Sequence, residues 1–363
     1  MIKKKILIAT GGTGGHIFPA LSLAKYFTNE NFEIEISSDK RGLKFLKDSK
    51  NINLVKISSS PIIKKTFFKF LISLFQIFFS IIKSIVYLAL NRPSIVFGMG
   101  GYSSFPICIA ASILRIKFVI YENNLIIGKA NKYLLPFTEK IFVSYKELEG
   151  ISKKYDDKVE EIGNIVREEI LYSRLASQNN KSETMKILVL GGSQAARVFA
   201  DKLPQVFGKL KEKNFSLKVY QQCLHEQNYQ LSEFYKKAKI DYEIFNFTNN
   251  IIDFYSKVNL VITRSGASVL GELINLKMPF ISIPLPTSTD NHQYKNAEFY
   301  SKKGYGYLLE EKEINERLYD LIKSFLSDKT MIDNLLAKQR QYSDKDIFIN
   351  LHNQIKKILN GKN

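Results

Sequence analysis

The sequence contains no tryptophan and only two cysteines among its 363 residues. Cys108 and Cys223 are far apart and have no metal-ligand spacing, so a disulfide-stabilised secreted module and a cysteine-based zinc site are excluded. A reducing cytoplasm is the simplest compartment for such a chain. Apolar residues make up 45% of the sequence, which suffices for two ordinary cores at about 150 residues per domain.

A long apolar run at the amino terminus is also lacking, which argues against an export signal. The short apolar stretch Ile6–Ala9 is followed at once by glycines, and this order predicts a buried strand, a glycine loop and a helix. The same order recurs at 186–197, where Gly191-Gly-Ser-Gln-Ala-Ala-Arg197 follows an apolar run. Two such beginnings predict two domains.

Strand-like apolar runs alternate with helical patterns over the whole length, which predicts an α/β fold with parallel sheets. The remaining predicted strands are Ile34–Ser37, Ile95–Gly98, Phe118–Tyr121, Lys140–Ser144, Lys218–Gln221, Leu260–Thr263 and Phe280–Pro284. The charged, turn-rich region 156–165 is the predicted boundary between the domains. A last helix is expected at 347–359, and the pattern alone leaves open on which domain it packs.

Acidic residues are absent from 49–121, although the chain as a whole has 53 Lys and Arg against 35 Asp and Glu, a formal charge of +18. That interval contributes half of the net positive charge, because it contains Lys50, Lys56, Lys64, Lys65, Lys69, Lys83, Arg92, Arg115 and Lys117. A basic excess is typical of proteins that meet nucleic acid, an anionic membrane surface or phosphorylated substrates. No nucleic-acid-binding module accompanies it, so we expect no nucleic-acid partner.

Glycine and proline are absent from 62–91, a phenylalanine-rich segment with some likeness to a membrane-spanning helix. On a helix its polar residues share an arc of about 100°; they are Lys65, Thr66, Lys69, Ser73, Gln76, Ser80, Lys83, Ser84, Tyr87 and Asn91. A spanning helix has little reason to keep such a stripe, so we expect an amphipathic helix. Two interpretations stay open: a core helix packed on several sides, or a helix whose apolar arc packs partly inward and partly in the lipid interface.

The loop Gly11-Gly-Thr-Gly-Gly-His16 is dense in glycine, which lets backbone N–H groups approach an anionic ligand at a helix N-terminus. It matches neither the dinucleotide fingerprint nor a P-loop, so a phosphate-and-hydroxyl cradle and a purely structural turn both stay open. His16 stands where the helix pole disfavours the imidazolium. A neutral imidazole there would accept a proton from an attacking hydroxyl, or it would only cap the loop.

Three stretches in the second half carry polar groups suited to phosphate or hydroxyl groups. Ser193 would donate to a phosphate oxygen, unless its loop is a plain tight turn. Arg264-Ser-Gly-Ala-Ser-Val-Leu-Gly-Glu272 opens a predicted helix, and the carboxylate of Glu272 suits a pair of sugar hydroxyls, unless the stretch is only an ordinary helix start. Asp290-Asn-His-Gln-Tyr-Lys-Asn-Ala297 gathers amide, carboxylate and imidazole groups, which are poor core material and suit a polyol.

Metal-ligand patterns are weak. Asp344-Lys-Asp346 matches the carboxylate pair of metal-dependent sugar transferases, but no predicted strand precedes it. An acidic turn at the start of a helix is the better interpretation. No group of His, Cys and Asp has metal spacing, so we expect no metal and no cofactor.

Taken together, these motifs resemble those of the MurG family of peripheral-membrane glycosyltransferases, which belongs to glycosyltransferase family 28. The resemblance covers nearly the whole chain and rests on Gly11–His16 with Pro19, Gly98-Met-Gly-Gly-Tyr102, Glu122-Asn-Asn124 with Gly128 and Asn131, Gly163-Asn-Ile-Val-Arg167, Gly191-Gly-Ser-Gln194, Arg264–Ala267 with Glu272, and Asp290–Ala297. It implies a GT-B fold, in which two Rossmann-like domains with parallel sheets face each other across a cleft.

The resemblance also implies an activity. The family inverts the anomeric centre while it transfers N-acetylglucosamine (GlcNAc) from UDP-GlcNAc to the C4 hydroxyl of the N-acetylmuramic acid (MurNAc) of lipid I, giving lipid II and UDP in peptidoglycan biosynthesis. It implies an acceptor domain at 1–163 that faces the membrane, a helix at 341–363 that packs back on it, and a donor domain at 164–340. The implied location is peripheral, on the cytoplasmic face of the bacterial inner membrane, with an anionic lipid surface and other cell-wall and division proteins as partners.

Residue roles follow from the resemblance by position. The donor-binding positions are Thr13, Gly14, Gly15, Asn124, Arg167, Ser193, Thr248, Ala267, Ser268, Val269, Leu270, Gly271, Glu272, His292 and Gln293. Among them Arg167 and Thr248 would approach the uracil, Glu272 the ribose, and Gln293 with His292 the GlcNAc hydroxyls. His16 is the candidate base. On the amphipathic helix, the expected membrane-facing residues are Phe75, Phe78, Phe79, Lys69 and Lys83.

Two other functions stay open. A different GT-B UDP-sugar transferase would act on another membrane lipid, such as diacylglycerol. A non-enzymatic scaffold would bind the nucleotide and recruit cell-wall proteins without turnover.

Overall fold

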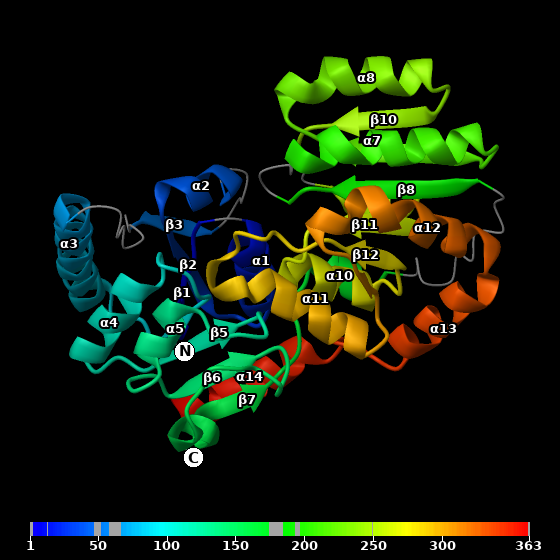
Figure 1. Ribbon diagram of the computed structural model, residues 1–363. Coiled ribbons are helices and arrows are strands. Elements are labelled where there is room, and N and C mark those ends of the chain that lie inside the picture. Colours follow the sequence, from blue (N-terminus) through cyan, green and yellow to red (C-terminus); the bar gives the residue numbers. More distant parts are fainter. Residues whose placement is uncertain are drawn as a thin grey trace. The chain divides into compact units, whose positions relative to one another are not determined.

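The structure is a computed structural model that describes residues 3–12, 14–46, 52–57, 67–173, 184–192, 197–248 and 250–361. The chain divides into two compact units (Figure 1). The first unit comprises Met1–Arg167 with Asp344–Asn363, and the second comprises Glu168–Ser343. The domain bounds that the resemblance implies, at 163 and 341, stay a prediction. Thr13, Ser193 and the basic residues Lys50, Lys64 and Lys65 lie outside the described residues.

The first unit is built on a parallel sheet of seven strands in the order β3-β2-β1-β4-β5-β6-β7. The strands are β1 (Lys5–Ala9), β2 (Glu33–Ser38), β3 (Asn53–Lys56), β4 (Ile95–Gly98), β5 (Phe118–Glu122), β6 (Lys140–Val143) and β7 (Val159–Glu161). The central strands are continuous apolar runs because helices cover both faces of such a sheet. Ile6 of β1 pairs with Ile34 on one side and with Ile95 on the other.

Six α-helices surround this sheet in the described part of the first unit: α1 (Gly14–Asn29), α2 (Lys40–Leu46), α3 (Phe67–Asn91), α4 (Phe105–Ile113), α5 (Lys129–Leu134) and α14 (Ile347–Leu359). A 3₁₀ segment, Lys153–Lys158, precedes β7. The helix α14 returns from the end of the chain and packs against α1, where Phe348 stacks on Tyr26 with the ring centroids 5.0 Å apart. The last helix, which the periodicity left unplaced, therefore belongs to the first unit.

The second unit has a parallel sheet of six strands in the order β10-β9-β8-β11-β12-β13. The strands are β8 (Met185–Leu190), β9 (Leu217–Gln222), β10 (Asp241–Phe245), β11 (Leu260–Thr263), β12 (Phe280–Ser282) and β13 (Tyr307–Leu308). The helices are α6 (Glu168–Leu171), α7 (Arg197–Glu212), α8 (Asn228–Lys237), α9 (Ile252–Tyr255), α10 (Ala267–Asn275), α11 (His292–Lys302), α12 (Ile314–Ser327) and α13 (Lys329–Arg340), with 3₁₀ segments at His225–Gln227, Thr289–Asn291 and Glu311–Glu313. The predicted α/β class, two Rossmann-like units with parallel sheets, is confirmed.

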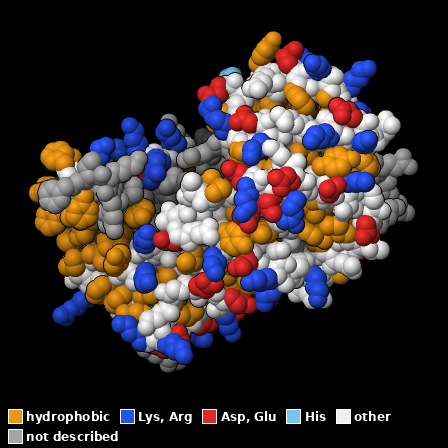
Figure 2. Space-filling model, in the orientation of Figure 1, with side chains coloured by type: hydrophobic (Ala, Val, Ile, Leu, Met, Phe, Trp, Pro, Cys, Tyr) orange, Lys and Arg blue, Asp and Glu red, His pale blue; other side chains and the backbone are white. Residues whose placement is uncertain are grey.

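The helix α3 turns its serines and Leu88 inward and most of its apolar arc outward. Ser73, Ser80 and Ser84 are buried on the side that packs along α4, and each hydroxyl donates to the carbonyl four residues earlier at 2.7–2.9 Å. Such small, self-satisfied side chains allow two helices to approach closely. The interpretation as a core helix packed on several sides is therefore wrong. Figure 2 shows the hydrophobic side chains gathered along α3, at the left of the view.

Candidate active site

The glycine loop between β1 and α1 lies against two other segments of the first unit. A β-carbon on Gly11 would lie 2.4 Å from the Ser103 hydroxyl oxygen, and Gly12 has a φ of +81°, so glycine is required at both positions. The carboxylate of the buried Asp39, after β2, accepts hydrogen bonds from the N–H groups of Gly12 at 3.1 Å and Gly42 at 2.8 Å. Asp39 therefore fixes the backbone of the loop at the carboxyl edge of the sheet.

Asp39 is expected to contribute measurably to stability. Burial alone raises the pKa of its carboxyl, but the N–H groups of Gly42 and Gly12 and the guanidinium of Arg41 outweigh burial and hold the pKa below its usual value. Asp39→Ala leaves two N–H groups without their acceptor, so we expect the free energy of unfolding at neutral pH to fall by about 1–3 kcal/mol. Urea denaturation of the full chain measures this loss.

The pH dependence of that loss has a definite sign. Because the pKa is lower in the folded protein, the ionised carboxylate stabilises the fold above the unfolded pKa, and this contribution disappears as the pH falls through the folded pKa. The difference between wild type and Asp39→Ala should therefore shrink on acidification. Arg41→Ala is the control, because its side chain is 61% exposed and its removal should cost less than about 1 kcal/mol. A difference that grew toward acid pH would contradict this role.

His16 is the third residue of α1, and its ring lies against the loop between β4 and α4. A β-carbon on Gly100 would lie 3.5 Å from the ring carbon Cε1, and one on Gly101 would lie 3.5 Å from Nε2. Both glycines have positive φ, at +83° and +75°. The loops that follow β1 and β4 therefore meet at the point where the strand order reverses, which is where ligands bind in open α/β sheets.

Glu122, at the end of β5, organises the neighbouring loop. Its carboxylate is 3% exposed and accepts hydrogen bonds from the N–H of Gly128 at 2.8 Å, the side-chain amide of Asn131 at 3.0 Å and that of Asn124 at 2.9 Å. The predicted donor-sugar residue Asn124 is therefore held by Glu122. Sequence reasoning placed Glu122 in a motif but gave it no role, because its partners are only apparent once the loop is folded.

The motif Gly163–Arg167 lies where the chain passes from the first unit to the second. Asn164 is buried and donates to the carboxylate of Asp344 at 3.2 Å, and a β-carbon on Gly163 would lie 2.2 Å from that same carboxylate. Asp344 lies in the acidic turn before α14, at the start of the segment Asp344–Asn363. It thus ties that segment to this motif. Arg167, the predicted uracil contact, stacks its guanidinium on Phe18 at 5.1 Å from the ring centroid.

The second unit places its predicted nucleotide-binding residues on α10. The helix begins at Ala267 after the N-cap Gly266, so its first N–H groups are presented directly after β11. Glu272 is buried, and its carboxylate accepts a hydrogen bond from the Tyr255 hydroxyl at 3.1 Å. Leu270 is fully buried and contributes only its backbone, whereas Ser268 and Val269 are half-buried. Near β10, the half-buried Thr248 hydroxyl accepts from the N–H of Asn250 at 3.0 Å.

The predicted GlcNAc-binding residues begin α11 beside a cavity of about 330 Å³. Gln293 accepts a hydrogen bond from the N–H of Leu285 at 2.9 Å, and a ring nitrogen of His292 lies 2.8 Å from the carbonyl of Thr289. Leu285 and Tyr294 are among the residues that line the cavity. The two residues before the helix, Asp290 and Asn291, both have left-handed backbone conformations. Strain of this kind is typical of functional sites.

Arg264 supports the wall of this cavity. Its buried guanidinium donates to the carbonyls of Ile283 at 3.3 Å and Pro284 at 3.2 Å, and it pairs with Glu311, which also lines the cavity. It lies over the ring of Phe199 at 4.6 Å from the centroid. The sequence indicated Arg264 only as part of a helix-start motif. Among the described residues, no group of three or more His, Cys, Asp and Glu side chains is placed to hold a metal ion.

Family models and curated proteins match most of this chain. The glycosyltransferase family 28 N-terminal domain matches residues 6–143, and the family 28 C-terminal domain matches residues 186–355. A Pelagibacter ubique protein named UDP-N-acetylglucosamine–N-acetylmuramyl-(pentapeptide) pyrophosphoryl-undecaprenol N-acetylglucosamine transferase is 36% identical over 345 residues, covering 94% of each chain. A Rickettsia felis protein of the same name is 33% identical, covering 93% of this chain and 96% of its own.

Solved structures agree on the fold. The crystal structure of MurG from Acinetobacter baumannii is similar with a TM-score of 0.78 and 22% sequence identity, and the match covers 98% of this chain and 100% of that one. At that level of identity the likeness concerns the architecture alone. It matches the two parallel-sheet units described above.

Proposed function

The chain belongs to glycosyltransferase family 28, and from that premise we propose that it transfers GlcNAc from UDP-GlcNAc to the C4 hydroxyl of MurNAc in lipid I, giving lipid II and UDP. The observation that carries the proposal is the 36% identity, over 94% of both chains, with a relative whose name states this transfer. The site supports it, because each unit presents a set of polar groups at the carboxyl edge of a parallel sheet.

The second unit binds the donor in this proposal. The N–H groups at the start of α10, Ala267–Gly271, bind the diphosphate and stabilise the negative charge that develops on the leaving UDP. Glu272 accepts from the ribose hydroxyls beside its bond to Tyr255. Gln293 and His292 contact the GlcNAc hydroxyls. Ser193, for the phosphate, and Thr248, for the uracil, complete the set of this unit, and Arg167 of the first unit also contacts the uracil.

The first unit binds the acceptor and supplies the base. The C4 hydroxyl of MurNAc must lose a proton as it attacks the anomeric carbon of GlcNAc, and His16 takes that proton on its imidazole. The amino-terminal pole of α1 favours the neutral ring that this step requires. Thr13, Gly14 and Gly15 border the diphosphate and the transferred sugar, and Asn124, held by Glu122, contacts the donor sugar.

The helix α3 places the first unit on the membrane in this proposal. Within the described residues, α3 is the one helix long and apolar enough by composition to cross a bilayer. Its serine side packs along α4, so we infer that the outward apolar arc lies in the interface instead. Phe75, Phe78 and Phe79 enter the acyl region, and Lys69 and Lys83 meet anionic head groups. The enzyme is then peripheral, on the cytoplasmic face of the inner membrane, where other cell-wall and division proteins are its expected partners.

Acceptor choice tests the proposed function. The purified full chain is given radiolabelled UDP-GlcNAc with either lipid I or diacylglycerol in the same detergent micelles. We expect the label to appear in the lipid I product, with one UDP released per transfer. We expect no label on diacylglycerol. Transfer to diacylglycerol alone would make the protein a different lipid glycosyltransferase, and donor binding without turnover on either acceptor would make it a scaffold.

A further inference from the structure

A second pocket of the first unit lies away from the candidate site. It has a volume of about 330 Å³ and is lined in part by Lys4, Arg92, Ser94, Arg115, Lys117 and Leu359. Lys4, Ser94 and Lys117 directly precede β1, β4 and β5. In a parallel sheet these amino ends lie at the edge opposite to the carboxyl ends that carry the glycine loop and Glu122. The pocket is therefore separate from the groups to which we assign the transfer.

The lining of this pocket is cationic. It holds four basic side chains and no carboxylate. Lys117 donates to the carbonyl of Ile358 at 2.6 Å, and Lys4 donates to the side chain of Asn360 at 3.3 Å. Both lysines therefore bind the carboxyl end of α14. In the part of the chain that the structure describes, the guanidinium groups of Arg92 and Arg115 make no hydrogen bond or ion pair. Two arginines thus remain to bind an anion, and phosphate suits their planar donor geometry.

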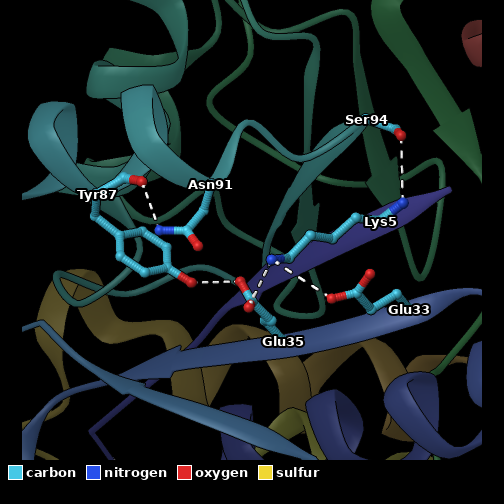
Figure 3. A network of polar contacts seen from close by, with 6 residues as sticks. All are labelled: Lys5, Glu33, Glu35, Tyr87, Asn91 and Ser94. Atoms are coloured by element: carbon cyan, nitrogen blue, oxygen red, sulfur yellow. Dashed lines mark hydrogen bonds and ion pairs between the residues drawn. The ribbon is translucent and has the colours of Figure 1, made fainter. Parts of the chain in front are cut away.

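The neighbouring carboxylates of Glu33 and Glu35 are already bound by Lys5 and Tyr87. Lys5 pairs with Glu35 at 2.7 Å and with Glu33 at 3.6 Å, and the Tyr87 hydroxyl also donates to Glu35 (Figure 3). The same figure shows Ser94, which accepts from the N–H of Lys5 at 3.3 Å, at the edge of this network. The network ties the end of α3 to the sheet, and Arg92 directly follows that end of the helix.

An exposed apolar rim adjoins the two arginines. Leu90, the last apolar residue of α3, is 81% exposed, and Ile113, at the end of α4, is 57% exposed. Each stands two residues before one of the arginines, Arg92 and Arg115. The outward apolar arc of α3 therefore runs without a break from the phenylalanines to this rim. A cationic hollow with an apolar rim fits an amphiphile whose charged end is a phosphate.

We propose that this pocket binds the headgroup phosphate of an anionic glycerophospholipid. The inference rests on the proposed peripheral attachment through α3 and specifies its geometry. A lipid held between Arg92 and Arg115 brings Leu90 and Ile113 to the acyl region. From Phe68 to Leu90 the helix is about 33 Å long, so contact at both ends requires α3 to lie along the bilayer surface.

The absence of tryptophan provides the test. Leu90→Trp and Phe75→Trp each introduce a single reporter at an exposed position. The full-length variants are titrated with vesicles of phosphatidylcholine containing phosphatidylglycerol, and with phosphatidylcholine alone, at one ionic strength. We expect a blue shift of both reporters on the anionic vesicles. A shift of Phe75→Trp without one of Leu90→Trp would overturn the headgroup pocket and leave the α3 attachment standing, whereas no shift of either would overturn both.

The charge of the pocket is tested separately. Arg92→Gln with Arg115→Gln should weaken binding to the anionic vesicles about 30-fold, since each cation near an anionic surface contributes roughly a fivefold factor. The matched control, Lys213→Gln with Lys237→Gln, removes the same charge from exposed positions of the second unit and should change binding less than about threefold. An equal loss in both pairs would show that only net charge matters and would overturn the pocket.

A soluble competitor separates the lipid from free phosphate. Excess inorganic phosphate, added at constant ionic strength, should leave the wild-type protein on the anionic vesicles, because it lacks the acyl chains that meet Leu90 and Ile113. Release by inorganic phosphate would assign the pocket to a soluble anion and overturn the lipid assignment.

Discussion

His16→Ala is expected to lower kcat for GlcNAc transfer to lipid I by about 10²–10⁴-fold, the range that positioned general bases supply. The imidazole stands at the amino end of α1 against Gly100 and Gly101, at the reversal of strand order in the first unit. Its removal takes away the proton acceptor for the C4 hydroxyl and leaves the donor residues of the second unit intact. The KM for UDP-GlcNAc should therefore change little. A filter assay of labelled lipid II measures both constants.

The control for this substitution is His225→Ala. His225 is exposed in the second unit and outside the proposed donor set, so its removal should keep kcat within about twofold. If His16→Ala kept a near-wild-type kcat with an unchanged thermal transition, the base would have to be another group or a water molecule.

Replacing Phe75, Phe78 and Phe79 together by glutamine should reduce partitioning onto phosphatidylglycerol-containing vesicles by about 100-fold. The three side chains are 63%, 58% and 57% exposed, so they hold little of the core together, and glutamine is a good helix former. Each ring that enters the interface contributes on the order of 1 kcal/mol, about half of its full burial. Vesicle co-sedimentation measures the change, and circular dichroism confirms the fold.

The matched control replaces three apolar residues exposed elsewhere, Tyr172, Tyr229 and Ile349, by glutamine. It should leave vesicle binding unchanged. The phenylalanine variant should also keep its kcat on a short-chain, water-soluble analogue of lipid I and lose activity only on acceptor embedded in vesicles. Unaltered vesicle binding of that variant would exclude this face of α3 from the membrane contact.

The central strands could be predicted from the sequence because burial on both faces demands continuous apolar runs. Ile95–Gly98 and Leu260–Thr263 have the bounds in the structure that the pattern predicts. The four edge strands, β3, β7, β10 and β13, were missed. None of them is a buried apolar run, because β13 has only two residues and the other three carry charged residues that no apolar pattern distinguishes from a loop.

The orientation of α3 could not be predicted from its periodicity. A polar stripe normally faces water, yet Ser73, Ser80 and Ser84 face α4. Serine is an exception because its hydroxyl is satisfied by its own helix, so burial costs it little. The hydrophobic pattern gives the two faces of a helix but not the face that the rest of the chain covers.

The candidate site was predicted where a local motif carries the chemistry and missed where distant residues meet. The glycine loop and His16 are contiguous in sequence, and so are the residues at the start of α10. Asp39 and Gly12 are joined by a hydrogen bond across 27 positions of the chain, and nothing near Asp39 in the sequence signals that contact. The supporting role of Arg264 likewise depends on Glu311, which folding brings beside it.

The most direct measurement of the proposed function is the structure of the product made by the purified full chain from UDP-GlcNAc and lipid I. Nuclear magnetic resonance of the disaccharide released from the lipid reports the anomeric configuration of GlcNAc and the position of its linkage. An inverting transferase acting on the C4 hydroxyl predicts a β-linked GlcNAc at C4 of MurNAc. An α-linkage, a linkage at another hydroxyl, or no disaccharide at all would contradict it.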